Sequence, residues 1–181
     1  MKFERSAGIL LHPTSLPGPY GVGSMGTEAF AFVDFLASAG QKLWQMCPLG
    51  PTGYGNSPYQ CFSAFAGNPL LIDLDDLVGR GLLVAADLAG APAFSDERID
   101  YPGVIACKMP LLKKAAKALV TRDDALDQLR LQLFAEANAT WLEDYACFAA
   151  LKEHFGGGPW SGWEYSLRRR DVGTLARYRE L

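Results

Sequence analysis

Two short apolar runs read GILLHP, residues 8–13, and LWQMCP, residues 43–48, and a proline closes each of them. Continuous apolar runs of this length are typical of strands that are buried on both faces of a parallel sheet. Between the runs, Thr27 offers an N-cap, and apolar residues then recur at helical spacing. The pattern predicts a buried strand over Gly8–Leu11 and a second strand over Leu43–Cys47, joined by a helix in a right-handed parallel crossover. The chain therefore opens as an α/β fold.

The rest of the chain is predicted to be mainly helical. Periodicity and capping residues predict a short strand over Leu70–Ile72, a short helix over Leu74–Val78, a helix over Val104–Leu119 that Pro110 interrupts or kinks, and a long helix over 123–155 that Gly156 ends. Two or three strands cannot close an eight-stranded barrel, which typically needs about 250 residues. The pattern is that of the first part of a larger α/β protein.

The composition excludes several classes of protein. With 181 residues, 49% of them hydrophobic, the chain is long enough for one sizeable core and is not disordered. Its net charge of −3 gives no general attraction to nucleic acid. No apolar segment approaches the length of about 18 residues that a membrane span needs, and none resembles an export signal. We therefore expect a cytoplasmic protein, and the composition leaves its oligomeric state open.

Cysteine and histidine usage predicts no metal site. The four cysteines are widely spaced in a chain without an export signal, which favours free buried thiols over disulfides or a metal cage. The two histidines lack the paired spacing of zinc ligands. The cysteines are Cys47, Cys61, Cys107 and Cys147.

Residues 21–26, GVGSMG, match the glycine pattern of dinucleotide-binding loops. In those loops the first glycine directly follows a strand, and the next strand ends in an acidic residue that binds ribose. In this chain a proline-containing stretch separates Leu11 from Gly21, and the second predicted strand ends in Cys47 and Pro48. The sequence therefore predicts no nucleotide cofactor, and the glycines serve loop geometry.

The candidate site residues lie in loops of the kind that form the active face of parallel α/β folds. Loop 50–60 is rich in glycine and proline and carries Tyr54 and Tyr59, and Tyr101 lies in a second such loop. Tyrosine rings there are rigid platforms with a polar tip, which suits the apolar face of a sugar ring. His12 ends the first predicted strand and either contacts a ligand or makes structural hydrogen bonds.

Carboxylates are missing from the predicted strand ends. No aspartate or glutamate directly follows either strand, and Asp73, Asp75 and Asp76 are best explained as the acidic start of the helix at Leu74. The residues therefore show no pair of acids for glycoside chemistry, and we predict no catalytic residue in this chain.

Five segments together resemble one known family. They read AGILLHPTSLPG (residues 7–18), WQ (44–45), PLGPTGYG (48–55), SPYQ (57–60) and SAFAGNP (63–69). They resemble the amino-terminal part of the 4-α-glucanotransferases, which are the amylomaltase or disproportionating enzyme family, glycoside hydrolase family 77. The resemblance is specific through residue 81 and looser through residue 160.

The resemblance implies a decorated (β/α)8 TIM barrel that cleaves an α-1,4-glucan, holds the fragment as a covalent glycosyl-enzyme and passes it to the 4-hydroxyl of an acceptor. Such retaining chemistry needs two carboxyl groups about 5–5.5 Å apart, and in the family both belong to later barrel strands. No cofactor is implied. Residues 1–75 correspond to the opening β/α units and residues 76–181 to a mainly helical insertion subdomain, so the barrel is incomplete in this chain.

The resemblance also implies roles for single residues. Tyr59 matches the tyrosine that stacks on the donor sugar beside the scissile bond, and Ser57 and Asn56 are placed to orient sugar hydroxyls. Tyr54 and Tyr101 match aromatic residues on a glucan path away from the catalytic centre. The implied partners are α-1,4-glucans, from maltose and maltodextrins to starch or glycogen fragments.

Three hypotheses follow from the sequence. The chain is the amino-terminal part of a transferase and is inactive by itself, or it is a natural truncated protein that binds α-glucan without catalysis. Alternatively, it is too incomplete to fold well, because an open parallel sheet leaves edges and apolar faces uncovered.

Overall fold

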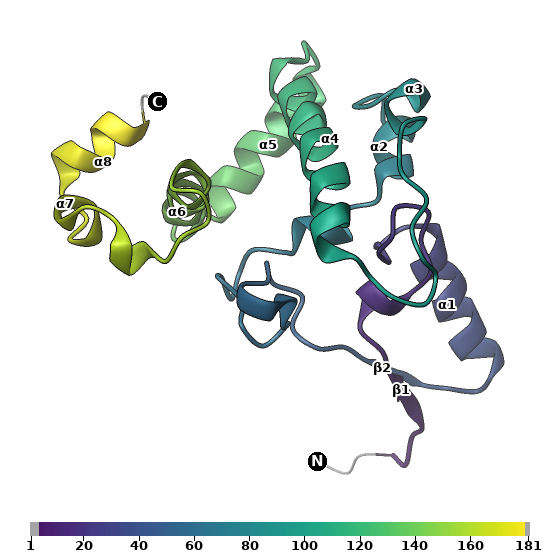
Figure 1. The fold of residues 1–181 in the computed structure, drawn as a ribbon. Coiled ribbons are helices and arrows are strands. Elements are labelled where there is room, and N and C mark those ends of the chain that lie inside the picture. Colours follow the sequence, from purple (N-terminus) through teal and green to yellow (C-terminus); the bar gives the residue numbers. More distant parts are fainter. Residues whose placement is uncertain (1–3, 180–181) are drawn as a thin grey trace. The chain divides into compact units, whose positions relative to one another are not determined.

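The computed structural model describes residues 4–179, and the chain divides after Gln128 into two compact units. The predicted division after residue 75 concerns the barrel of a longer protein and stays a prediction. Figure 1 labels the elements, which in chain order are β1 (Gly8–Leu10), α1 (Thr27–Ser38), β2 (Leu43–Gln45), α2 (Leu74–Gly79), α3 (Ala85–Leu88), α4 (Tyr101–Thr121), α5 (Ala125–Ala137), α6 (Leu142–His154), α7 (Tyr165–Arg168) and α8 (Val172–Arg179).

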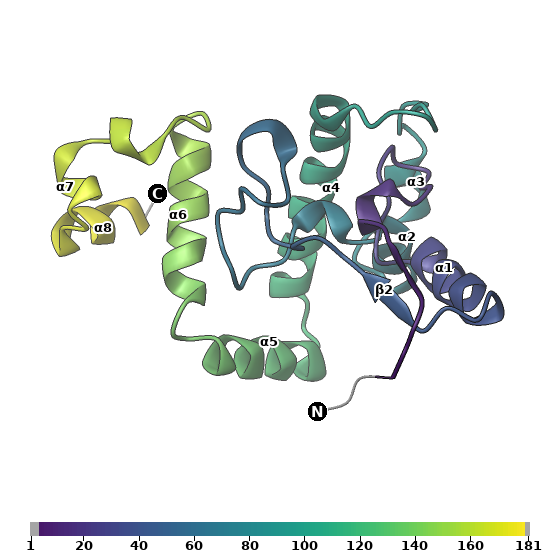
Figure 2. The same ribbon diagram turned by 90° about the horizontal axis from the view of Figure 1, so that it is seen from below.

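The first unit opens with the predicted arrangement of strand, helix and strand. β1 and β2 pair in parallel, with Gly8 opposite Leu43. α1 lies beside the strand pair in both ribbon views (Figures 1 and 2), and Phe32 of α1 meets Trp44 of β2 edge to face, with ring centroids 5.0 Å apart. The expected parallel β/α start is confirmed.

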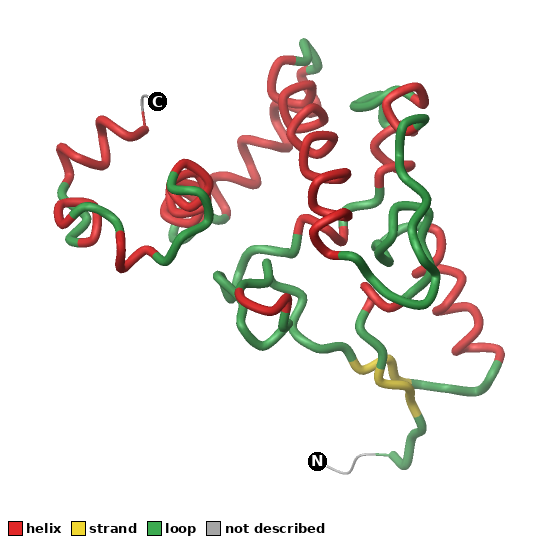
Figure 3. Tube along the Cα trace, in the orientation of Figure 1, coloured by secondary structure: helices red, strands yellow, loops and turns green. Residues whose placement is uncertain are grey.

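The prediction that the first strand is buried is wrong for this chain. The side chains of Ile9 and Leu10 are 40% and 61% exposed. Among residues 4–179, β1 and β2 (yellow in Figure 3) form the whole sheet. Two strands leave apolar faces that further strands and helices would have to cover. The exposure of β1 therefore follows from the size of the sheet and not from the strand's own sequence.

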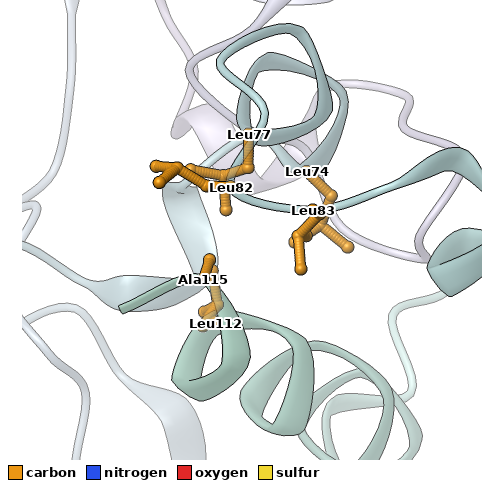
Figure 4. Close-up of a cluster of buried hydrophobic side chains, with 6 residues drawn as sticks. All are labelled: Leu74, Leu77, Leu82, Leu83, Leu112 and Ala115. Atoms are coloured by element: carbon orange, nitrogen blue, oxygen red, sulfur yellow. The ribbon is translucent and has the colours of Figure 1, made fainter. Parts of the chain in front are cut away.

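A cluster of buried aliphatic side chains joins α2 to α4 and forms one part of the core of the first unit. Figure 4 shows its members, which are Leu74, Leu77, Leu82, Leu83, Leu112 and Ala115. The predicted helix at Leu74 and its acidic cap are confirmed, because Asp73 Oδ1 accepts the Asp76 amide at 2.9 Å. The cap satisfies a backbone donor that the first helical turn leaves unpaired.

The strand predicted over Leu70–Ile72 is absent, and a 3₁₀-helix, η3 (Pro69–Leu71), occupies most of that segment. The Asn68 side chain accepts the Leu70 amide at 3.0 Å. Pro69 stands at the first helical position, where a missing N–H costs no hydrogen bond. The Asn-Pro pair therefore overrides the apolar run.

The long helix predicted over 123–155 is wrong, because α5 and α6 are separate helices. The Asn138 side-chain amide donates to the Phe134 carbonyl at 2.8 Å, and its Oδ1 accepts the Trp141 indole N–H at 3.0 Å. Such side-chain bonds compete with the backbone bonds of a helix and end it. In contrast, α4 continues through Pro110, which starts no new segment.

The second unit has its own small core between α6 and the C-terminal helices. Leu151, Trp163 and Leu167 are buried together. The predicted glycine stop of α6 is confirmed, because Gly156 has a φ of +65°, which side-chain-bearing residues rarely adopt. Within residues 4–179, no helix is long and apolar enough to cross a membrane, and no group of three or more His, Cys, Asp or Glu side chains is arranged to hold a metal ion.

Lys108 of α4 is a fully buried charged residue in the first unit. Its Nζ donates to the carbonyls of Leu70 and Ile72, at 2.7 and 2.8 Å, and so ties α4 to the η3 segment. Burial disfavours the charged form and lowers the pKa of Lys108 from 10.5 to about 8, although the nearby Asp73 opposes this shift.

This burial predicts a rise in stability above pH 8. The unfolded chain keeps the Lys108 proton up to about pH 10.5, whereas the folded chain releases it near pH 8, so the unfolded state binds more protons in this window. We expect the free energy of unfolding to rise by about 2 kcal/mol from pH 8 to pH 10. Urea unfolding followed by tryptophan fluorescence at pH 8, 9 and 10 measures it.

The matched comparison uses two lysines of the same helix. Lys108→Met should lose the rise, and Lys117→Met, which removes an exposed charge, should keep it. If Lys108→Met kept the full rise, another group would be responsible, and the interpretation of Lys108 would be wrong.

Candidate functional site

The carboxyl ends of β1 and β2 lie at one edge of the sheet, because the two strands are parallel. His12 follows β1, and Cys47 and Pro48 follow β2. The Trp44 indole N–H donates to the Leu11 carbonyl at 2.8 Å and holds the two chain segments together beyond the strands. The parallel pairing therefore brings His12 and Cys47 to the same edge of the sheet.

The His12 ring is held by protein atoms on both nitrogens. Nδ1 lies 2.7 Å from the Thr14 hydroxyl and also faces the Thr14 amide at 3.3 Å, and Nε2 lies 3.3 Å from the Pro48 carbonyl. Because a carbonyl only accepts, this network assigns the proton to Nε2 and the acceptor role to Nδ1. The contacts favour the structural alternative for His12, and its contact with a sugar stays a prediction.

Loop 50–60 is tied at its base and carries little regular structure. Thr52 and Cys61 form an antiparallel bridge, and the Gly53 amide donates to the Gln60 carbonyl at 2.8 Å. At its tip lies a 3₁₀-turn, η2 (Tyr54–Asn56), whose Asn56 has a φ of +53°. The expectation of a turn-rich loop is confirmed, with one short helical turn inside it.

Tyr59 presents its ring to solvent and anchors its hydroxyl at the end of β2. The side chain is 75% exposed, and its Oη lies 3.7 Å from Cys47 Sγ, to which it donates. This hydrogen bond is the main cause of a raised pKa of the Tyr59 hydroxyl. The Tyr59 amide donates to Ser57 Oγ at 3.3 Å, so Ser57 shapes the turn beneath the ring.

Tyr54 and Tyr101 occupy different surroundings. Tyr54 is 90% exposed at the tip of loop 50–60. Tyr101 is the first residue of α4, so its prediction as a loop residue is wrong, and Asp100 before it caps the helix. Its ring packs against the cluster that contains Val22 and Val104, and it lines a pocket of about 490 Å³ between residues 14–22 and 95–101.

Sequence reasoning missed the part that Cys47 plays. All four cysteines are free as predicted, but each is half-buried, so the prediction of buried thiols is wrong. The sequence predicts Cys47 at a strand end and Tyr59 in a loop, but nothing in their spacing predicts that the two side chains touch.

Asp73 has the structural role that was predicted, because its Oδ2 also accepts the Ser24 hydroxyl at 2.6 Å.

Residues 11–181 match the family model described as 4-alpha-glucanotransferase, Glyco_hydro_77. The chain belongs to the 4-alpha-glucanotransferase family. The match covers both units and includes loop 50–60 and every candidate site residue named above. The expected kinship is confirmed.

Curated 4-alpha-glucanotransferases are similar to nearly the whole chain. The protein from Thermus thermophilus is 51% identical over 97% of this chain, and that from Synechocystis is 46% identical over 95%. The potato protein, described as chloroplastic/amyloplastic, is 43% identical over 95%. These matches cover 34%, 34% and 30% of the relatives, so the chain spans about a third of their length.

A solved 4-alpha-glucanotransferase structure also resembles the chain. It is described as amylomaltase from Streptococcus agalactiae in complex with acarbose, and it matches with a TM-score of 0.90 and 41% identity. The match covers 97% of this chain and 35% of that one.

Proposed function

We propose that this chain is the amino-terminal part of a 4-α-glucanotransferase and supplies one wall of its substrate site. The position of Tyr59 carries the proposal, because its exposed ring is anchored at the carboxyl end of β2. Parallel α/β folds bind their substrates at this edge. The family membership supports α-1,4-glucans as the substrate class.

The proposed reaction is a retaining transfer. In the complete enzyme a carboxylate attacks the anomeric carbon and forms a glycosyl-enzyme, while a carboxylic acid protonates the leaving oxygen. The same group then takes the proton of an acceptor 4-hydroxyl, which displaces the enzyme carboxylate. We assign both acids to barrel strands outside residues 4–179, so this chain is inactive by itself.

Loop 50–60 positions the donor sugar in this proposal. The Tyr59 ring stacks on the sugar, and Ser57 and Asn56 orient its hydroxyls, since the Ser57 hydroxyl hydrogen is still available while Oγ accepts the Tyr59 amide. Tyr54 and Tyr101 contact the glucan farther from the reacting bond. Transfer requires that a sugar hydroxyl outcompetes water, and a tied loop helps by positioning the donor and excluding solvent.

The same proposal explains why the strand pair of β1 and β2 is exposed in this chain. Residues 1–75 form the opening β/α units of a (β/α)8 barrel, and residues 76–181 form a helical insertion. The likeness to one third of a solved amylomaltase supports this assignment. The action of the complete enzyme in the cytoplasm stays a prediction.

Two measurements test the proposal. The intact mass of the protein from its native source should be well above the 19.7 kDa of residues 1–181. A mass of 19.7 kDa together with saturable maltodextrin binding would instead establish a truncated glucan-binding protein. In addition, the purified chain should leave maltotriose unchanged, and the appearance of glucose with longer glucans would overturn its proposed inactivity.

Tyr59→Ala tests the site itself in the complete enzyme. Loss of the stacking platform should lower kcat/KM for transfer from maltotriose about tenfold, which corresponds to about 1.4 kcal/mol. Tyr165→Ala is the control, because Tyr165 is another exposed tyrosine, with 66% of it accessible, and it belongs to the second unit. An unchanged kcat/KM in Tyr59→Ala would remove Tyr59 from the donor site.

A further inference from the structure

The Tyr59 side chain is held at two levels. Its backbone lies in the tied loop 50–60, where the Ser57 hydroxyl accepts the Tyr59 amide and the Ser57 carbonyl accepts the Gln60 amide at 3.0 Å. These bonds fix the Cα–Cβ bond but not the direction of the ring. A side chain that is 75% exposed has few packing contacts that could fix it. What holds its far end therefore decides where the ring points.

The far end of the ring meets Cys47. The Tyr59 hydroxyl donates to Cys47 Sγ at 3.7 Å, across twelve residues of sequence. The Cys47 backbone is itself held, because Cys47 lies two residues after β2 and because the carbonyl of the next residue, Pro48, accepts a hydrogen bond from His12 of the neighbouring strand end. The thiol is thus an acceptor carried by a held backbone segment at the edge of the sheet.

We propose that Cys47 is a positioning residue that sets the orientation of the Tyr59 ring for glucan stacking. The inference rests on the proposed function, because it takes Tyr59 to be a glucan platform. Cys47 does not touch the sugar, and it acts by holding the tyrosine hydroxyl while the ring face stays open. The raised pKa of Tyr59 agrees with a hydroxyl that keeps its proton for this bond.

The first measurement reports the bond without any glucan. The tyrosinate absorbance near 295 nm is titrated in the chain and in its Tyr59→Phe variant, and the difference isolates Tyr59 among the seven tyrosines. Cys47→Ala should lower the pKa of Tyr59 toward that of ordinary tyrosine, whereas Cys147→Ala in the second unit should leave it unchanged. An unchanged Tyr59 titration in Cys47→Ala overturns the proposal.

The second measurement reports the consequence for binding. Calorimetric titration of the complete enzyme with acarbose, the ligand of the solved relative, should give an affinity that falls about fivefold in Cys47→Ala and in Tyr59→Phe, as for the loss of one hydrogen bond. The double variant should be no weaker than either single one, because both remove the same interaction. Cys47→Ser keeps an acceptor and should return the affinity to within about twofold of the unaltered enzyme.

The outcomes separate this proposal from the proposed function. If Tyr59→Ala weakens glucan binding and Cys47→Ala does not, the positioning role is wrong and the glucan site stands. If the complete enzyme does not bind acarbose, or if Tyr59→Ala leaves its affinity unchanged, the glucan platform is overturned together with this inference, even where the Tyr59 titration still shows the bond to Cys47.

Discussion

Gly23→Ala is expected to destabilise the first unit by about 3 kcal/mol or more. A Cβ at this position would lie 2.1 Å from the Pro13 carbonyl oxygen and 2.7 Å from that of Leu16. Both are backbone atoms, so neither can turn aside as a flexible side chain would. The Gly23 amide also donates to the Thr14 carbonyl at 3.1 Å, which holds the two segments at this short distance.

The effect should reach the candidate site, because η1 (Pro13–Ser15) follows His12 directly and Thr14 supplies both Nδ1 contacts of that ring. Displacing η1 therefore weakens the support of the His12 ring, whose Nε2 donates to the Pro48 carbonyl and links the ends of β1 and β2. The midpoint of urea unfolding, read from tryptophan fluorescence, measures the loss.

The control for this prediction is Gly79→Ala at the end of α2. A Cβ at Gly79 meets nothing within 4 Å, and alanine is the better helix former by about 0.5–1 kcal/mol, so this variant should be as stable as the unaltered chain or more so. Equal midpoints for Gly23→Ala and the unaltered chain would show that the contact with Pro13 relaxes without cost.

Gly23 also shows why the glycine pattern of residues 21–26 does not indicate a nucleotide site. The pattern matches a nucleotide fingerprint letter by letter, and its distance from the first strand and the missing acidic residue after the second strand argue against that function. In the structure Gly23 allows close backbone approach to Pro13, and Gly21, with a φ of +76°, leaves room that a Cβ would take from the Phe94 ring. The same residue type therefore serves packing within the loop.

The predictable part of the fold is the part that local sequence determines. The parallel pair of β1 and β2 follows from two apolar runs around one helical pattern, and the cap at Asp73 follows from its position before Leu74. The strand predicted over 70–72 is absent because the Asn68-Pro69 capping signal, which the sequence does contain, outweighs the apolar run.

Other features depend on contacts that no local pattern encodes. Asn138 ends α5 through bonds to Phe134 and Trp141, and a single asparagine within a helical pattern gives no sign of which bonds it will make. At the site, the strand ends were predictable, whereas the contact of Tyr59 with Cys47 spans two elements and appears only once both are placed.

The last prediction concerns Leu10→Ala. The loss of stability that this substitution causes should depend on whether the protein is the short chain or the complete enzyme. In the chain of residues 1–181 the Leu10 side chain is 61% exposed, so Leu10→Ala should change the free energy of unfolding by less than about 0.5 kcal/mol. In a complete barrel both faces of each strand are covered, and the same change should cost about 2–5 kcal/mol. Urea unfolding of both proteins measures the difference.

Leu74→Ala is the matched control, because Leu74 is already fully buried in the first unit's own core and does not depend on further strands to cover it. It should cost about 2–5 kcal/mol in the short chain and in the complete protein alike. A small, equal cost of Leu10→Ala in both proteins would mean that β1 stays exposed in the longer one. The opening strands would then not belong to a closed barrel, and the edge that carries His12, Cys47 and Tyr59 would need another explanation.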